Sequence, residues 1–295
     1  MTGSPAPPTP CPSPTDSPTW RPIPVILLSL PVSLPGVYAP QDDTELLVHA
    51  LGREPVAPRA RVLDVGTGTG AVALAAARRG ALVTAVDISW RAVLNAKVNA
   101  VLARLPMTVV RGDLLGPVSG RSFDLILSNP PYVPGPEPAR RSGPGQGPGA
   151  APRPDRLSPA RGAARAWDGG WDGRLVLDRI CRDSPPLLRP GGVLLLVHSA
   201  LSGAERTLTQ LRAAGLRADV VEHRRVAFGP VLRSRSDWLR GRGLLRAEGD
   251  GDGGSHDGIG DGGSHDGIGD GGSHDGIGDG DEKEELVIIR AESPR

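Results

Sequence analysis

The fold is decided by a ten-residue stretch, Arg61-Val62-Leu63-Asp64-Val65-Gly66-Thr67-Gly68-Thr69-Gly70. Its first five residues predict a short buried strand, and the Ala-rich run at 71–79 that follows predicts a helix. Glycines between a strand and a helix permit a tight turn and close approach of a ligand to the backbone, and the helix N-terminus faces that ligand. The stretch therefore predicts a nucleotide-type site on an α/β fold. Its Gly-x-Gly-x-x-Ala spacing also fits a dinucleotide site.

Three acidic residues stand where predicted strands end. Asp64 lies just before the glycine loop, two residues ahead of Gly66, where a negative charge would repel a pyrophosphate but suits the positive sulfonium and amino groups of S-adenosylmethionine. Asp87 ends the apolar run 82–86, about 20 residues beyond the glycines, where a carboxylate can accept hydrogen bonds from ribose hydroxyls. Asp113 follows a third predicted strand at 107–110 and is a candidate acceptor for an adenine amino group. Asp87 and Asp113 also have local alternatives, as a helix cap and a turn residue.

The tetrapeptide Asn129-Pro130-Pro131-Tyr132 follows a strand-like apolar run at 123–128. Prolines have no N–H, and a residue before proline avoids the helical region, so a stiff extended loop is expected at the end of this strand. The Asn129 side-chain oxygen and the Pro130 carbonyl would be two fixed acceptors for both hydrogens of a planar –NH2 group. In a chain with 31 prolines, an ordinary loop breaker is the alternative.

Together with two further blocks, these motifs resemble the class I S-adenosylmethionine-dependent methyltransferases, and within them the HemK-type protein-glutamine methyltransferases. The first block is Val-Tyr-Ala-Pro-Gln-Asp-Asp-Thr-Glu-Leu-Leu at 37–47, and the second is Ala-Trp-Asp-Gly-Gly at 166–170. The resemblance is closest to the short eukaryotic and archaeal branch, which lacks a long N-terminal helical domain. It extends over roughly residues 34–133, 165–245 and 284–291.

The resemblance implies S-adenosyl-L-methionine as the cofactor and assigns roles to individual residues. The Asn129 oxygen and the Pro130 carbonyl would hold the substrate nitrogen, and Tyr132 would wall the pocket by packing against the substrate amide. The residues that would contact the cofactor or line its pocket are Tyr38, Thr44, Asp64, Gly66, Gly68, Gly70, Asp87, Asp113, Leu114 and Asn129.

The predicted fold class is α/β, a seven-stranded, mostly parallel, doubly wound Rossmann-like sheet with an antiparallel last strand, which is the class I methyltransferase fold. Strands are expected from about residues 61, 82, 107, 123, 193 and 218, alternating with helices. Residues 188–192 are expected to form the turn into the fifth strand. The last strand, 286–290, is expected to pair in a hairpin with 218–228, and the cofactor is expected across the carboxyl ends of the strands.

A single methyltransferase domain is predicted at 23–248 and 284–295. The Pro/Ser/Thr-rich tail at 1–22 is expected to be disordered, and the basic Pro/Gly-rich loop at 133–165 to be flexible. Residues 249–283 form an acidic insert with three copies of the nonapeptide Gly-Gly-Ser-His-Asp-Gly-Ile-Gly-Asp, which is also expected to be disordered. The whole chain has a net charge of +1, because the negative charge of this insert offsets the positive charge of the remainder.

Cysteine usage indicates a reducing, cytoplasmic setting, since Cys11 and Cys181 lie in unlike contexts and no spacing indicates a metal site. The apolar run 25–34 is too short to span a bilayer and is interrupted by Pro31, so no membrane segment is expected. Relatives in the short branch work with a small zinc-binding activator that covers an apolar surface. We expect 25–34 to cover that surface in this chain.

The favoured function is N5-methylation of a protein glutamine, with a peptide release factor as the target that the resemblance implies. The alternatives are methylation of an exocyclic amine of adenine or guanine in DNA or RNA, of a lysine, or of a small-molecule amine. Aromatic residues are only 3% of the chain and no separate target-recognition domain is visible, which disfavours nucleic acid. A non-catalytic cofactor-binding protein is disfavoured because Asp64, Asp87 and Asn129 are all present. An NAD-dependent oxidoreductase is disfavoured because nothing resembling a set of hydride-transfer residues follows the glycines.

Overall fold

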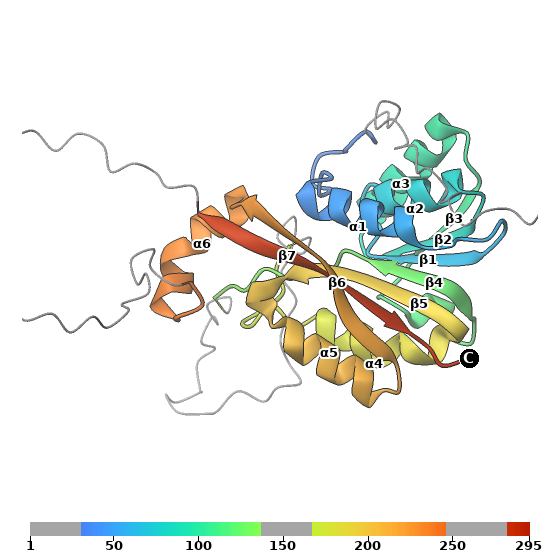
Figure 1. The fold of residues 1–295 in the computed structure, drawn as a ribbon. Helices are drawn as coiled ribbons and strands as arrows, with labels where there is room; N and C mark the ends of the chain where they lie inside the picture. Colours follow the sequence, from blue (N-terminus) through green and yellow to red (C-terminus); the bar gives the residue numbers. More distant parts are fainter. Residues whose placement is uncertain (1–30, 137–166, 246–281) are drawn as a thin grey trace, which may run out of the picture. The chain divides into compact units, whose positions relative to one another are not determined.

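The computed structural model describes residues 31–136, 167–245 and 282–295, which contain a seven-stranded sheet (Figure 1). The strand order is β3-β2-β1-β4-β5-β7-β6. The strands are β1 (Arg61–Val65), β2 (Leu82–Asp87), β3 (Met107–Arg111), β4 (Phe123–Ser128), β5 (Leu188–Ser199), β6 (Arg217–Ala227) and β7 (Lys283–Glu292). β7 runs antiparallel to both β5 and β6, and the other neighbouring pairs are parallel. The predicted mostly parallel sheet with an antiparallel last strand is confirmed.

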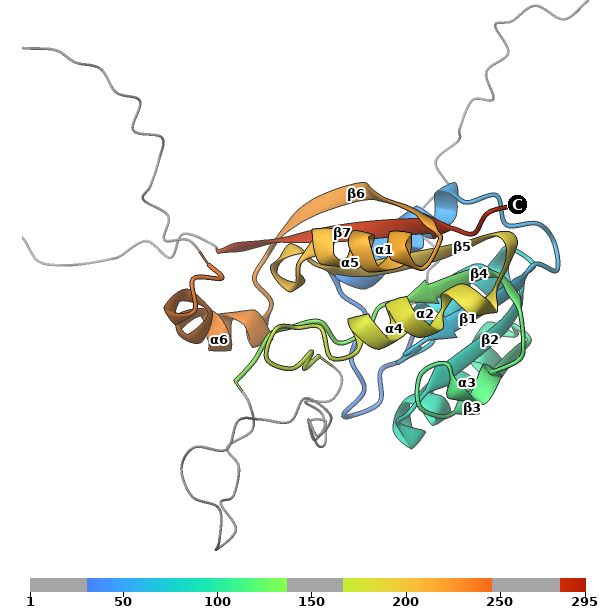
Figure 2. The same cartoon turned by 90° about the horizontal axis from the view of Figure 1, so that it is seen from below.

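Helices cover both faces of this sheet. On one face lie α1 (Asp42–Arg53), α2 (Ala71–Arg78) and α3 (Trp90–Ala103) (Figure 1). On the other face lie α4 (Leu177–Asp183) and α5 (Ala204–Ala213) (Figure 2). α6 (Pro230–Gly241) follows the end of β6. The sequence patterns had not singled out α1 or α6.

In the described parts of the chain, three short 3-10 turns connect these elements: η2 (Gly116–Val118), η5 (Pro185–Leu187) and η6 (Ala200–Ser202). The central strands are apolar on both faces, as expected for parallel strands covered on both sides. Leu63 of β1, Ile126 of β4 and Leu194 of β5 are each 0% exposed. The sheet is thus a rigid platform whose carboxyl ends carry the loops described below.

The turn predicted at 188–192 lies inside β5, so this prediction was wrong in its boundary. Gly191 has φ +73°, and its N–H bonds to the carbonyls of Ser293 at 3.2 Å and Pro294 at 3.1 Å. The register with β4 also shifts between Phe123 and Leu125. The bend that Pro-Gly-Gly indicated is present as an irregularity within the strand, because residues beyond β7 supply hydrogen-bond partners there.

The first residues of the predicted flexible loop, 133–135, form backbone hydrogen bonds with another segment. The Val133 N–H bonds to the Trp167 carbonyl at 3.0 Å, and the Gly135 N–H bonds to the Gly170 carbonyl at 2.9 Å. Residues 133–135 are therefore held alongside 167–170. The rest of the predicted loop and the predicted tail at 1–22 lie outside the described residues. So does the acidic insert, except for 282–283, where β7 begins.

The third glycine of the decisive stretch, Gly70, is a packing residue. It begins α2 with φ +85°, a conformation that residues with a side chain rarely adopt. A Cβ at this position would lie 3.1 Å from the Cβ and 3.3 Å from the Cα of Ala96 in α3. Gly70 therefore allows α2 and α3 to approach each other closely.

We expect Gly70→Ala to lower the free energy of unfolding by about 2–4 kcal/mol, because the new methyl group meets Ala96 in addition to the strain of a positive φ. Gly80→Ala is the matched control. Gly80 has φ +82° and nothing within 4 Å of an added Cβ, so only the backbone strain of about 1–2 kcal/mol applies. Urea denaturation of both variants measures the difference. Equal losses would show that the contact with α3 does not contribute.

Candidate active site

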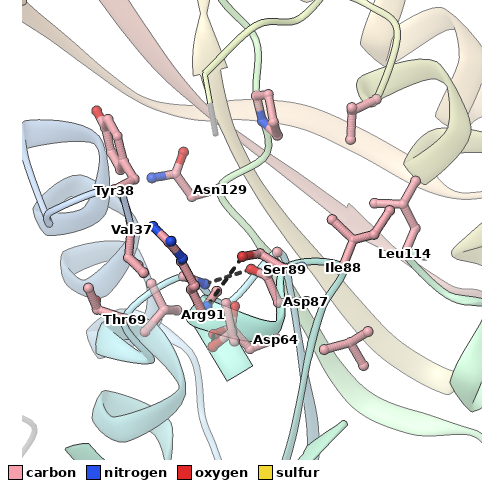
Figure 3. A pocket seen from close by; sticks show the side chains of 18 of the residues that line it. Val37, Tyr38, Asp64, Thr69, Asp87, Ile88, Ser89, Arg91, Leu114 and Asn129 are labelled. Carbon is pink, nitrogen blue, oxygen red and sulfur yellow. Dashed lines mark hydrogen bonds between the residues drawn. The ribbon is translucent and has the colours of Figure 1, made fainter. Parts of the chain in front are cut away.

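A cavity of about 630 Å³ lies at the carboxyl ends of β1, β2 and β4 (Figure 3). This volume is typical of small-molecule and cofactor sites, and the position is where open parallel sheets bind ligands. The structure brings nine of the predicted site residues together around it: Tyr38, Thr44, Asp64, Gly66, Gly68, Asp87, Asp113, Leu114 and Asn129. Nine of the ten residues predicted to contact the cofactor or line its pocket therefore surround one space.

Three predicted site residues do not line this cavity. Gly70 packs against α3, as described above. Pro130 is buried, and its neighbour Pro131 lines the cavity. Tyr132 is 7% exposed and its hydroxyl donates to Asp43. The roles predicted for the Pro130 carbonyl and the Tyr132 ring concern the acceptor side of the site, and they stay predictions.

The glycine loop presents backbone, not side chains, to the cavity. Gly66 and Gly68 have φ +74° and +55°. The Gly66 N–H bonds to the Val86 carbonyl of β2 at 2.9 Å. A Cβ at Gly68 would lie 4.0 Å from the Tyr38 carbonyl, so the loop lies opposite the segment before α1. The floor of the cavity is therefore open to a ligand that approaches the main chain closely.

Asp87 joins the glycine loop to the start of α3. One carboxylate oxygen, Oδ2, accepts from the Gly68 N–H at 3.0 Å, and the other, Oδ1, accepts from the Ser89 N–H at 2.8 Å (Figure 3). Burial raises the pKa of Asp87 above its usual value, although these hydrogen bonds oppose the shift. Because each carboxylate oxygen can accept more than one hydrogen bond, Asp87 retains acceptor capacity toward the cavity.

Asp64 is a buried carboxyl group at the base of the cavity. It is 2% exposed, and Oδ2 accepts from the Thr67 hydroxyl at 2.6 Å. Burial raises the pKa of Asp64 to about 7, and the nearby Asp87 charge adds to the rise, while hydrogen bonds from Thr67 and Ala73 oppose it. A positive charge placed beside Asp64 would favour its ionised form.

The sequence analysis missed Asp43, the centre of a hydrogen-bond network behind the cavity. Its Oδ2 accepts from the hydroxyls of Tyr38 at 3.2 Å and Tyr132 at 3.1 Å. Its Oδ1 accepts from the Thr44 N–H at 2.6 Å and the Thr44 hydroxyl at 3.2 Å. The Thr44 oxygen in turn accepts from Asn129 Nδ2 at 3.2 Å. The only signal in the sequence was the position of Asp43 within the 37–47 block.

This network fixes the orientation of the Asn129 amide. A carboxylate only accepts, so the Thr44 hydroxyl must donate to Asp43 and can only accept from Asn129. Asn129 therefore directs its NH2 group to Thr44, and its Oδ1 remains to accept a hydrogen bond from a ligand. Burial and the Asp43 charge raise the pKa of both Tyr38 and Tyr132, so both hydroxyls stay protonated as donors.

The segment around the start of α4 also lines the cavity. Arg179 forms a bidentate ion pair with Asp113, with distances of 3.2 Å from Nη1 to Oδ1 and 2.6 Å from Nη2 to Oδ2. Leu175 and Val176, which precede α4, line the cavity together with Leu114. The sequence analysis missed Arg179, although the Ala-Trp-Asp-Gly-Gly block just before it indicated that this segment belongs to the site.

Among residues 31–136, 167–245 and 282–295, no group of three or more His, Cys, Asp or Glu side chains is arranged to hold a metal ion. No helix in these ranges is long and apolar enough to cross a membrane. Burial raises the pKa of the Cys181 thiol to about 12, which keeps this cysteine in its unreactive form at neutral pH.

The chain is similar to known methyltransferases in sequence. The profile of the methyltransferase small domain matches residues 31–140. A relative from Methanocaldococcus jannaschii, whose assigned name is protein N5-glutamine methyltransferase, is 33% identical over 199 residues, which are 67% of this chain and 90% of the relative. The release factor glutamine methyltransferase of Deinococcus radiodurans is 37% identical over 206 residues, 69% of this chain and 66% of that protein.

The fold is also similar to that of a solved methyltransferase. The structure of the E. cuniculi Mtq2–Trm112 complex, responsible for methylation of the translation termination factor eRF1, matches with a TM-score of 0.50 at 21% identity. The match covers 88% of this chain and 99% of that chain. The chain spans only 66% and 59% of the bacterial relatives from Deinococcus radiodurans and Gloeobacter violaceus.

The raised pKa of Asp64 predicts pH-dependent binding of a positively charged ligand. Asp64 ionises as the pH rises through about 7, so the affinity for S-adenosylmethionine should increase about tenfold between pH 6 and pH 8. Titration calorimetry at several pH values measures this slope. In Asp64→Asn, which cannot ionise, the slope should be flat and the affinity low throughout. An unchanged slope in the variant would assign the pH dependence to another group.

Proposed function

Because the chain belongs to the protein N5-glutamine methyltransferase family, we propose that it transfers a methyl group from S-adenosyl-L-methionine to the amide nitrogen of a glutamine side chain in a protein. The observation that carries the proposal is the orientation of Asn129, whose Nδ2 is held by Thr44 at 3.2 Å, while its Oδ1 receives no hydrogen bond from the part of the chain that the structure describes. As the acceptor we propose a peptide release factor, because the bacterial relatives are named for that substrate. A cytoplasmic setting, where release factors act, belongs to the same proposal.

The cavity has the donors and acceptors that S-adenosylmethionine requires. Gly66 and Gly68 leave the main chain accessible, as an extended ligand in close contact needs. Asp87 retains acceptor capacity for ribose hydroxyls, and the buried Asp64 carboxyl group suits a positive charge. Asp113 lines the cavity and suits an amino group of the base, with Arg179 beside it. When bound, the cofactor supplies a methyl group on a positively charged sulfur.

The mechanism that we propose depends on orientation and charge. An amide nitrogen is a poor nucleophile because its lone pair is delocalised into the carbonyl group. Asn129 Oδ1 and the Pro130 carbonyl would accept both hydrogens of the substrate –NH2 and hold its nitrogen in line with the methyl group. The same two oxygens would stabilise the positive charge that develops on the nitrogen. Neither of these two oxygens needs to remove a proton from the nitrogen before the methyl transfer.

The names of the relatives argue against the other classes of methyl acceptor. The two acceptor oxygens would also hold an exocyclic amine of a nucleic acid base, but the relatives at 33–37% identity are named for glutamine. The same names weigh against lysine and small amines. The NAD-dependent oxidoreductase alternative is excluded by family membership.

Asn129→Ala should reduce methyl transfer at least 100-fold and change the cofactor dissociation constant less than about threefold, because Asn129 serves the acceptor nitrogen. Tritiated-methyl transfer to a purified release factor and calorimetry with the cofactor measure the two quantities. Thr44→Val keeps the side-chain shape but removes the oxygen that orients Asn129, and should reduce transfer about tenfold. Equal losses of transfer and cofactor binding in Asn129→Ala would contradict this division of labour.

We also propose that a small activator subunit covers an exposed apolar stripe on α3, because the similar protein Mtq2 forms a complex with Trm112. The stripe consists of residues that repeat at helical spacing and are 39–76% exposed: Trp90, Leu94, Val98, Val101 and Leu102. Contiguous apolar surface of this kind is typical of interaction sites. β3 lies next to α3, and among the described strands it is the one at this edge of the sheet.

Part of the segment that we expected to cover this surface does lie along α3. The Val32 N–H bonds to Asn99 Oδ1 at 3.1 Å, and the Leu34 N–H bonds to Asn95 Oδ1 at 2.8 Å. Asn95 and Asn99 are buried and adjoin the stripe without belonging to it. Residues 25–30 of the expected cover lie outside the described residues. Val32 and Leu34 bind these asparagines and leave the stripe residues 39–76% exposed.

Val101→Asp should abolish complex formation with a co-expressed Trm112-type protein, because a charge in a desolvated apolar interface is costly. Size-exclusion chromatography of the co-expressed pair measures complex formation. Val221→Asp is the control, since Val221 lies on β6 at the opposite edge of the sheet and is 41% exposed. A complex that survives Val101→Asp but not Val221→Asp would place the partner elsewhere.

A further inference from the structure

Ser202, at the end of η6, forms a hydrogen bond with the loop that carries Asn129. Its hydroxyl lies 2.7 Å from the Tyr132 carbonyl oxygen, and the residue is 2% exposed. A carbonyl oxygen can only accept, so the Ser202 hydroxyl is the donor of this bond. The mechanism above assigns no role to Ser202.

Two different parts of Tyr132 are held by two different elements. Its hydroxyl donates to Asp43 of α1 at 3.1 Å, and this bond fixes the ring. The bond from Ser202 instead fixes the peptide group between Tyr132 and Val133. The N–H of that peptide group bonds to the Trp167 carbonyl at 3.0 Å. Without Ser202 a single hydrogen bond would hold the peptide group, and the group could rotate about it.

The position of this peptide group is transmitted to the acceptor oxygens. Only Pro130 and Pro131 separate Asn129 from Tyr132, and each proline ring fixes its φ angle. Asn129 itself follows Ser128, which is paired in the sheet with both β1 and β5. The tetrapeptide is therefore a short, stiff span that is fixed at both ends, and a shift at Tyr132 moves the Pro130 carbonyl.

Gly173 leaves the space that the hydrogen bond between Ser202 and Tyr132 occupies. Its φ is +74°. A Cβ at this position would clash with the Tyr132 carbonyl oxygen and would lie 2.6 Å from Ser202 Oγ. A methyl group at residue 173 would therefore push the donor and the acceptor apart.

The next residue, Arg174, holds Ser202 in place. Arg174 is 2% exposed, and its Nη1 donates to the Ser202 carbonyl at 2.7 Å while its Nε pairs with Asp178 at 2.7 Å. Leu175 and Val176, which follow it, line the cofactor cavity. One short segment therefore lines the cavity and also supports the donor that holds the acceptor loop.

We propose that Ser202 is a positioning residue for the methyl acceptor: through the Tyr132 carbonyl it holds the Pro130 carbonyl where that oxygen accepts a hydrogen of the glutamine amide. This inference rests on the proposed glutamine methylation. Thr44 orients one of the two acceptor oxygens, on Asn129, and Ser202 positions the other. Small displacements of a group that orients a reacting atom lower the rate steeply.

Ser202→Ala in the full-length chain removes the donor. It should lower kcat for methyl transfer to a purified release factor about tenfold, and change KM for the release factor and the cofactor dissociation constant less than about threefold. Ser184→Ala is the matched control, because Ser184 is 0% exposed and its hydroxyl has no hydrogen-bond partner among the described residues. The control should keep kcat within about twofold of the wild type. Tritiated-methyl transfer well below the melting temperatures of the variants and calorimetry with the cofactor measure these quantities.

Gly173→Ala breaks the same hydrogen bond without changing Ser202. Adding Ser202→Ala to Gly173→Ala should lower kcat no further, because the bond is already lost. Equal kcat in Ser202→Ala and Ser184→Ala, a parallel loss of cofactor affinity, or additive losses in the double variant would overturn the inference. If the wild type transfers no methyl group to the release factor, the proposed function itself fails, and the inference fails with it.

Discussion

The Asp43 carboxylate is the constraint on which the rest of the site depends. It is buried, and it can only accept hydrogen bonds, so the direction of every bond around it is fixed. Through Tyr38 it holds the segment that faces the glycine loop, and through Tyr132 it holds the loop after β4. Through Thr44 it sets the orientation of Asn129. The segment before α1, the loop after β4 and the Asn129 amide are thus all positioned by one group on the first turn of α1.

The site concentrates carboxyl groups that are costly to bury. Burial raises the pKa values of Asp64 and Asp87 above their usual range. Proteins accept such local costs mainly at functional sites, where a ligand supplies the missing charge or donor. Methyl transfer moves positive charge from the cofactor sulfur to the acceptor nitrogen. Nearby carboxyl groups favour positive charge both before and after the transfer.

The sequence indicated the parts of the fold that local patterns specify, and it missed those that depend on distant contacts. The apolar runs and the glycine stretch located the strands, and the strand ends located Asp64, Asp87 and Asn129. Asp43 was missed because its bond to Tyr132 joins residues 89 positions apart. Gly70 was assigned to the cofactor because spacing alone does not show a contact with Ala96. The pairing of 133–135 likewise depends on 167–170, which no local pattern shows.

The order of the strands has a consequence for biosynthesis. β6 pairs only with β7 in the sheet, and β7 follows β6 in the chain after a long connection. During translation β6 therefore has no strand partner until β7 has left the ribosome, and this edge of the sheet is completed in a single late step. Doubling the length of a loop adds only about 0.6 kcal/mol to the entropy cost of closing it. The long connection between these two strands therefore delays completion of the sheet far more than it weakens the finished fold.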